Sequence, residues 1–169
     1  MAITDPLTGL YNPRGLSELG RREIDRARRF NRPLSAIFLD LDDFKEVNDT
    51  YGHVNGDQVL ISLANACRQN IREVDIIGRM GGDEFVVLLP ETELKSACQV
   101  AERLRRFTEQ MRITTEIAQI QVTASLGVGL YTEEMKDLAT LIDQADMAMY
   151  AAKQAGKNRV MDCHAVQGN

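Results

Sequence analysis

Acidic side chains gather at the end of one apolar segment of this 169-residue chain. Residues 34–41 (LSAIFLDL) form a continuous apolar run of strand length, and such a run predicts a strand buried on both faces. Asp40, Asp42 and Asp43 lie at its end. Asp40 and Asp42 share a face because side chains alternate along a strand. A carboxylate in this position needs a partner, since desolvating a bare charge is costly.

A second group of acids lies in a glycine turn. Gly81 and Gly82 precede Asp83 and Glu84, between two segments that read as strands. Glycine accepts a positive φ and lets the backbone approach a bulky ligand such as a nucleotide. If this hairpin neighbours the first strand, its acids converge with Asp40 and repel it unless a cation intervenes. Magnesium binds one or two carboxylates plus substrate phosphates, and a pair of such ions can clamp a phosphoryl displacement.

Three lysines could supply local positive charge for phosphates. Lys45 follows the acidic cluster, and Lys153 and Lys157 flank the end of a predicted helix. Lysines at a helix C-terminus are also favoured by the helix dipole, so their position alone does not indicate a ligand.

The acids have an ordinary alternative role as turn residues or helix caps. That role suits Asp42, Asp43 and Asp49, and the Gly-Gly-Asp sequence is by itself good turn chemistry. From the residues alone, a metal and phosphate site is therefore indicated without being fixed.

The surrounding pattern predicts strands interleaved with helices. Helices are expected over residues 13–30, from a turn-rich stretch at 48–57 to about 70, over 92–111 and over 137–153. Strands are expected over 34–41, 75–80, 84–89, 120–130 (interrupted at Gly127 and Gly129) and 159–161. The hairpin excludes a purely parallel sheet. The pattern favours an α+β fold with a mixed, mostly antiparallel sheet surrounded by helices.

Composition bounds the class of protein. The length suits one domain, with 44% hydrophobic and 27% charged residues, and no apolar run approaches the roughly 20 residues of a membrane span. No signal peptide is visible at the start, so a cytoplasmic location is expected. A net charge of −5 argues against broad nucleic-acid binding. The three cysteines, Cys67, Cys98 and Cys163, lack metal-ligand spacing and read as buried thiols.

The exposed side of the first predicted helix is rich in arginine. A solvated face is one interpretation, and a contact surface for an upstream domain or a partner is the other. The residues concerned are Arg21, Arg22, Arg26, Arg28 and Arg29.

The glycine turn belongs to a longer set of ordered motifs. In chain order these are residues 5–12 (DPLTGLYN), 38–45 (FLDLDDFK) with 48–53 (NDTYGH) and 56–57 (GD), 81–85 (GGDEF), 125–128 (SLGV) and 145–153 (ADMAMYAAK). The chain resembles the GGDEF family in these blocks, almost from end to end. The five-residue signature alone could arise by chance, but five blocks in the right order over residues 5–159 could not plausibly do so.

The resemblance implies a palm-like nucleotidyl-cyclase fold in a single domain, residues 1–169 with a core of about 5–161. It implies a diguanylate cyclase that condenses two GTP molecules into cyclic di-GMP and two pyrophosphates. The implied cofactor is Mg²⁺ or Mn²⁺, two ions per GTP. Catalysis would need a homodimer of half-sites. The full-length protein would carry an upstream sensor domain, so this fragment alone is expected to turn over slowly.

The resemblance also assigns roles to residues. Asp40, Asp83, the Leu41 carbonyl and Glu84 would bind the metal ions, with Asp83, Glu84 and Lys45 acting in catalysis. The substrate-binding residues would be Asn48 and Asp57 at the guanine, Lys45, Lys153 and Lys157 at the triphosphate, and Phe44, His53, Gly81 and Gly82 around them. For His53, satisfying its own loop is an equal alternative. Lys157 stands where the family often has arginine. Lysine keeps the positive charge of arginine but cannot form its two parallel hydrogen bonds. Pro13 also stands where the family commonly has arginine.

A second, inhibitory product site is implied by Arg72-Glu73-Val74-Asp75, which matches the family's RxxD motif at the expected offset from Gly81. Arg103 falls where the family often supplies another arginine. These arginines would pair with product phosphates or stack on guanine. An ordinary surface ion pair is the alternative.

Two other functions are compatible with the sequence. A catalytically silent GGDEF module would bind GTP or cyclic di-GMP as a sensor, but such modules usually lose signature acids, and Asp40, Asp83 and Glu84 are present. A different nucleotidyl cyclase is the second, and Asn48 with Asp57 favours guanine over adenine.

Overall fold

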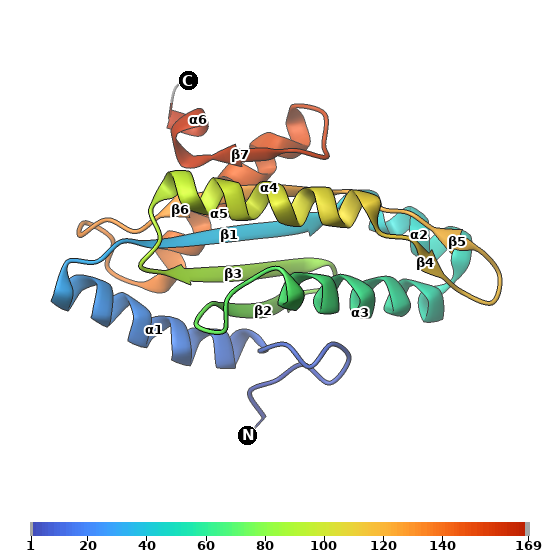
Figure 1. Ribbon diagram of the computed structural model, residues 1–169, viewed down its shortest axis with the longest axis horizontal. Helices are drawn as coiled ribbons and strands as arrows, with labels where there is room; N and C mark the ends of the chain where they lie inside the picture. The colour runs from blue at the N-terminus through green and yellow to red at the C-terminus, as the bar shows by residue number, and fades with distance from the viewer. Residues whose placement is uncertain (1, 168–169) are drawn as a thin grey trace.

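A five-stranded sheet forms the centre of the protein, with helices packed around it (Figure 1). The computed structural model describes residues 2–167. The elements are α1 (Pro13–Phe30), β1 (Leu34–Leu41), α2 (Phe44–Tyr51), α3 (His53–Gln69), β2 (Ile76–Gly81), β3 (Glu84–Pro90), α4 (Leu94–Gln110), β4 (Ile113–Thr114), β5 (Gln119–Ile120), β6 (Ala124–Leu130), α5 (Leu138–Gln154), β7 (Val160–Asp162) and α6 (Cys163–Gln167). The strand order is β2-β3-β1-β6-β7, and every neighbouring pair is antiparallel except β6 and β7. The predicted mixed, mostly antiparallel sheet is confirmed.

The central strand β1 divides the core into two layers. Ile37 and Leu39 pack in one cluster with the apolar sides of α3 and α4. Ala36 and Phe38 point the other way and pack in a second cluster with α1 and α5. Both clusters are buried, so the prediction of a strand covered on both faces is confirmed. Burial on both sides explains why its sequence is a continuous apolar run.

The predicted turn-rich stretch at 48–57 is wrong. Residues 44–51 form α2, and α3 begins at His53. The two helices are separated by Gly52 alone, whose φ of 87° is accessible because glycine has no side chain. The Gly52 N–H donates to the Asn48 carbonyl at 2.8 Å and closes α2. The Asn and Asp residues here suggested several turns, although one glycine provides the whole break.

The predicted strand over 120–130 is also corrected. The sheet strand β6 begins at Ala124, and Ile120 belongs to a separate hairpin in which it pairs with Ile113. Gly127 does not interrupt β6. A β-carbon at Gly127 would overlap the backbone of α5 at Ala145, so this glycine lets the helix lie directly on the strand. The hairpin strand β4 and the terminal helix α6 were not predicted.

Helix α1 has the expected bounds and an exposed basic side. The Asn12 side chain accepts a hydrogen bond from the Gly15 N–H, and proline occupies the first turn. The five arginines are exposed; Arg28 donates to the Tyr131 hydroxyl at 3.2 Å and Arg26 pairs with Glu23. The solvated-face interpretation fits these contacts, and the contact-surface alternative stays a prediction. Within residues 2–167, no helix combines the length and apolarity needed to cross a bilayer.

The three thiols are buried or half-buried. Burial raises the pKa of Cys67 to about 12, and burial with the nearby Asp162 raises the pKa of Cys98 to about 11. These pKa values leave little reactive thiolate at neutral pH, in keeping with the interpretation of buried thiols.

The contact between β6 and α5 gives a stability prediction. Gly127→Ala places a methyl group against helix backbone, which cannot move as a flexible side chain can, and should lower the free energy of unfolding by about 1–3 kcal/mol or more. Urea unfolding followed by circular dichroism measures this change. Gly82→Ala is the matched control, because no atom lies within 4 Å of its β-carbon position, and should stay within about 0.5 kcal/mol of wild type. Equal stability of the two variants would contradict the close-packing argument.

Candidate active site

The sheet brings the two groups of acids together. Asp40, near the end of β1, lies opposite Glu84 on β3 and opposite Ser125 on β6. The turn before β3 is tied to β1, since the Leu41 N–H donates to the Asp83 carbonyl at 3.3 Å. The hairpin is therefore a neighbour of the first strand, as the metal-site prediction requires.

Asp40 and Asp83 form the centre of this acidic group. Burial, the charge of Asp83 and a hydrogen bond shared with it raise the pKa of Asp40 to about 6, against the opposing effect of Lys153. Burial and the charge of Asp40 raise the pKa of Glu84. Within residues 2–167, no three His, Cys, Asp or Glu side chains gather closely enough to hold a metal ion. The expected three-way convergence is thus a close carboxylate pair with Glu84 beside it.

The ammonium group of Lys153 lies against two of the oxygens assigned to metal and against one that is not. Its Nζ is 3.0 Å from Asp40 Oδ1 and 3.0 Å from the Leu41 carbonyl, which are assigned to metal, and 2.8 Å from Asp42 Oδ1, which is not. A cationic group is therefore already accommodated beside Asp40 and Leu41. The predicted ligands Asp40, Asp83 and the Leu41 carbonyl offer hard oxygens, and two carboxylates with a carbonyl leave room for phosphate ligands, so these residues fit a magnesium ion.

The predicted guanine-binding residues lie on the two helices that flank Gly52. The amide group of Asn48 and the ring of Phe44 lie against Gly56, in the first turn of α3. Asp57 follows Gly56 and is exposed. Asn48 and Asp57 are thus on helices, although the prediction put them in a loop.

The remaining predicted contacts are on the surface. Lys45 and His53 are exposed, and in the described part of the chain neither side chain has a hydrogen bond or ion pair. Lys157 pairs with Asp43 at 2.6 Å, and both side chains are about half exposed. His53 begins α3, so the structure gives no support to a side chain that satisfies a turn.

The residues predicted for the inhibitory site make contacts within the protein, centred on Arg72. Its guanidinium holds Asp75 through two bonds, at 2.8 and 3.3 Å, and also donates to the Pro90 carbonyl and the Thr92 hydroxyl at 2.9 Å. The hydrogen bond to Asp75 raises the pKa of Arg72. Arg103 on α4 donates to the Asn70 carbonyl at 3.2 Å, two residues from Arg72 in sequence. The Arg72 side chain is 55% exposed and that of Asp75 is 2% exposed, so the pair joins a surface guanidinium to a buried carboxylate.

The sequence model of the family described as "Diguanylate cyclase, GGDEF domain" matches residues 2–159. The chain belongs to the GGDEF family. The signature acids of that family are the ones that meet at the end of β1.

Named relatives are diguanylate cyclases. The chain is 40% identical to diguanylate cyclase DgcP of Pseudomonas aeruginosa over 159 residues, covering 94% of this chain and 24% of DgcP. Diguanylate cyclase SiaD of P. aeruginosa, solved with its activator SiaC, superposes with a TM-score of 0.91 at 39% identity over 95% of this chain and 62% of SiaD. The GGDEF domain of DgcB from Caulobacter crescentus, solved with c-di-GMP, gives 0.92 at 27% identity over 97% of both chains.

The chain corresponds to only a part of its curated relatives. The chain spans between 24% and 43% of the length of these curated diguanylate cyclases and response regulators.

Asp146 on α5 is a member of the acidic group that the sequence analysis did not single out. Burial and the charges of Asp143 and Asp40 raise its pKa, and its own charge raises that of Glu84. The available signal was helical spacing: Asp146 precedes Lys153 by seven residues, two turns of helix, and so shares its face.

Arg79 on β2 connects the GGDEF hairpin to the start of the chain. Its Nη1 lies 3.2 Å from Asp5 Oδ1, and its Nε donates to the Gly82 carbonyl at 3.0 Å. Asp5 also caps the turn that contains Thr8. Nothing local in the sequence indicates this link, because its two charged partners are 74 positions apart.

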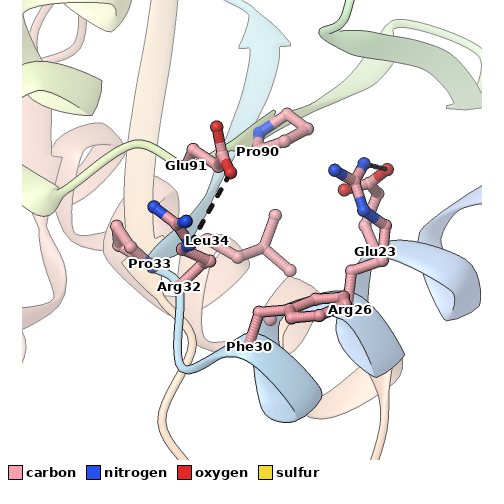
Figure 2. Close-up of a pocket in the computed structure, with 9 residues that line it drawn as sticks. Glu23, Arg26, Phe30, Arg32, Pro33, Leu34, Pro90 and Glu91 are labelled. Carbon is pink, nitrogen blue, oxygen red and sulfur yellow. Dashed lines mark hydrogen bonds and ion pairs between the residues drawn. The ribbon is translucent and has the colours of Figure 1, made fainter.

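A cavity of about 180 Å³ lies between the end of α1 and the sheet, at the opposite end of β1 from Asp40 (Figure 2). Figure 2 shows Arg32 facing Glu91, and Arg26 paired with Glu23, at its rim. Asp40, Asp83, Glu84 and Asp146 are not among its lining residues. The cavity is therefore separate from the candidate active site, although its Pro90 also accepts the hydrogen bond from Arg72.

Charge crowding at Asp40 gives a second stability prediction. Asp40→Asn in metal-free buffer removes a half-buried negative charge beside Asp83, and should raise the free energy of unfolding by about 1–2 kcal/mol at pH 8 after allowance for solvent screening. Because the folded state raises this pKa from 3.8 to about 6, the destabilising ionisation is complete above the higher value. The gain should therefore shrink as the pH falls from 6 towards 3.8.

The measurement is urea unfolding with a chelator present at several pH values. Asp25→Asn on the exposed side of α1 is the control and should change stability by less than about 0.5 kcal/mol. A destabilised Asp40→Asn protein at pH 8 would show that Lys153 more than compensates the repulsion.

Proposed function

We propose that this GGDEF domain is the catalytic part of a diguanylate cyclase, which joins two GTP molecules into cyclic di-GMP and releases two pyrophosphates. The observation that carries the proposal is the half-buried pair of Asp40 and Asp83, with a cationic group held beside Asp40 and Leu41. Buried like charges are costly, and a site that needs a cation to balance them is suited to metal-assisted phosphoryl transfer.

The proposed metal ligands are Asp40, Asp83 and the Leu41 carbonyl, with Glu84 beside them. Magnesium or manganese, two ions per GTP, would lower the pKa of the attacking 3′-hydroxyl and neutralise charge on the phosphoryl oxygens. Their fit rests on the all-oxygen donor set and on the Lys153 ammonium that it already accommodates.

The proposed guanine site is the α2–α3 junction. The Asn48 amide offers a donor and an acceptor, and the Asp57 carboxylate accepts from guanine N–H groups, which matches the mixed edge of that base. Phe44 and His53 lie beside them in sequence, and Gly81 with Gly82 leaves the hairpin free of side chains next to the nucleotide. This complementarity supports GTP over ATP as the substrate.

The catalytic and phosphate-binding roles follow from charge. Lys45, Lys153 and Lys157 would attract the triphosphate, and Lys45 would stabilise charge in the transition state. Asp83 would accept the proton of the 3′-hydroxyl or anchor the cation, with Glu84 in support.

The assembly needed for this reaction is a homodimer of half-sites, each domain contributing one GTP. Residues 5–161 would form the single catalytic unit, controlled by a sensor domain in the full-length protein. We place the reaction in the cytoplasm, where GTP is available, and propose cyclic di-GMP as an inhibitor that binds at Arg72, Asp75 and Arg103.

The activity test mixes the domain with GTP and Mg²⁺ at high protein concentration and follows cyclic di-GMP and pyrophosphate by chromatography. Wild type should form both products, and Asp83→Ala should retain less than about 1% of the rate because it removes the proposed metal ligand or proton acceptor. Asp25→Ala, on the outer side of α1, should keep full activity. GTP binding without any product would favour the silent sensor module, and an active Asp83→Ala protein would refute the assignment of Asp83.

The inhibition test uses Arg72→Ala. Loss of its guanidinium should raise the cyclic di-GMP concentration for half-inhibition about tenfold or more, since a bidentate contact with phosphate contributes at least about 1.4 kcal/mol. Initial rates at increasing product concentration measure this change. Arg22→Ala is the control for loss of an exposed arginine. Unchanged inhibition in Arg72→Ala would mean that Arg72 serves only as the ion-pair partner of Asp75.

A further inference from the structure

Asp42 is a buried carboxylate surrounded by donors at the end of β1. Its side chain is 2% exposed. Oδ1 accepts from the Ser125 hydroxyl at 2.7 Å and from Lys153 Nζ at 2.8 Å. Oδ2 accepts from the Thr123 hydroxyl at 2.7 Å and from the Asn158 N–H at 3.0 Å. Each oxygen thus accepts two hydrogen bonds. The donors lie on β6, just before β6, at the end of α5 and in the turn after α5.

These bonds fix the Asp42 carboxylate in one orientation. Two hydroxyls and a backbone N–H hold it in place, and the remaining donor is the Lys153 ammonium. The position of Lys153 Nζ is therefore tied to a carboxylate that is itself held by β6 and by the turn after α5.

The three acceptors around Lys153 have different proposed roles. Asp40 and the Leu41 carbonyl belong to the proposed metal ligands. Asp42 does not, and its oxygens are already engaged by two hydroxyls and a backbone N–H. A cation bound to Asp40 and Leu41 would compete with Lys153 for those oxygens and would leave its bond to Asp42 intact.

We propose that Asp42 is a positioning residue for GTP binding, which holds the Lys153 ammonium at the triphosphate while Asp40 and Leu41 bind the metal. This inference rests on the proposed function. Asp42 touches no substrate atom in this scheme and acts only through Lys153.

A purely structural role makes a different prediction. The same bonds join the end of β1 to β6 and to the turn after α5, so loss of Asp42 could weaken binding simply by loosening the site. Such loosening would add to the effect of removing Lys153, whereas an effect transmitted through Lys153 would vanish in its absence. A double-mutant cycle separates the two.

The cycle compares wild type, Asp42→Asn, Lys153→Met and the double variant. The probe is a GTP analogue with a methylene bridge between the α- and β-phosphates, titrated calorimetrically with saturating Mg²⁺. Each single variant should bind the analogue about tenfold more weakly, the loss expected for one charge-assisted contact. The double variant should bind no more weakly than Lys153→Met alone.

Two results would overturn the inference while leaving the proposed function in place. One is Asp42→Asn that binds the analogue as tightly as wild type does. The other is a double variant about a hundredfold weaker than wild type, the product of independent effects. A wild-type domain that does not bind the analogue would instead refute the proposed function, and this inference with it.

A milder pair of variants covers the case in which Asp42→Asn does not fold. Ser125→Ala removes one donor that holds Asp42, while Ser35→Ala removes a hydroxyl equally buried in β1 that bonds to the Thr92 carbonyl at the far end of the strand. Both should lower the melting temperature. Only Ser125→Ala should weaken analogue binding, by about threefold, a fraction of one hydrogen bond. Equal binding by the two variants would contradict the inference.

Discussion

Repulsion between carboxylates at the end of β1 governs the arrangement of the candidate site. Asp40 is half-buried beside Asp83, with Glu84 opposite on the next strand and Asp146 within electrostatic reach on α5. Such crowding is unfavourable unless positive charge enters. In the structure the Lys153 ammonium supplies that positive charge. In the proposed reaction, metal ions would supply part of it. The electrostatic cost to the fold and the proposed binding of metal ions therefore have the same origin.

Close packing between β6 and α5 makes this compensation possible. Because Gly127 has no side chain, α5 lies directly on the strand, and the end of the helix reaches the end of β1. Lys153 can then contact the Leu41 carbonyl and Asp42, more than a hundred positions away in sequence. A bulkier residue at position 127 would displace α5 and with it the Lys153 ammonium group. The glycine that looked like a strand interruption is thus a packing requirement of the site.

The rest of the site depends on local backbone breaks attached to the same sheet. Gly52 separates α2 from α3, so that Asn48 lies against the first turn of α3 next to Asp57. The hairpin that carries the signature is fastened to β1 through Leu41, and Arg79 ties its Gly82 carbonyl to Asp5. A displacement of Asp5 would therefore act through Arg79 on the hairpin that carries Asp83.

The sequence by itself determined the elements with strong periodicity and the identity of the acids. Helix α1 and strand β1 have the predicted bounds, because their apolar spacing reflects which sides are buried. The ordered motifs indicated the family that the comparisons established. Residues 48–57 were misjudged because Asn, Asp and Gly favour turns locally, while packing of α2 and α3 on the sheet selects helices.

Only the tertiary structure decided which charged groups meet. The pairing of Lys153 with Asp40 and Asp42, the proximity of Asp146 and the link from Arg79 to Asp5 join residues far apart along the chain. Periodicity reports the face on which a side chain lies, but the partner across that face is set by strand order and by how closely a helix approaches the sheet. Those depend on the whole core, and so the balance of charge at the site could not be obtained from the sequence pattern alone.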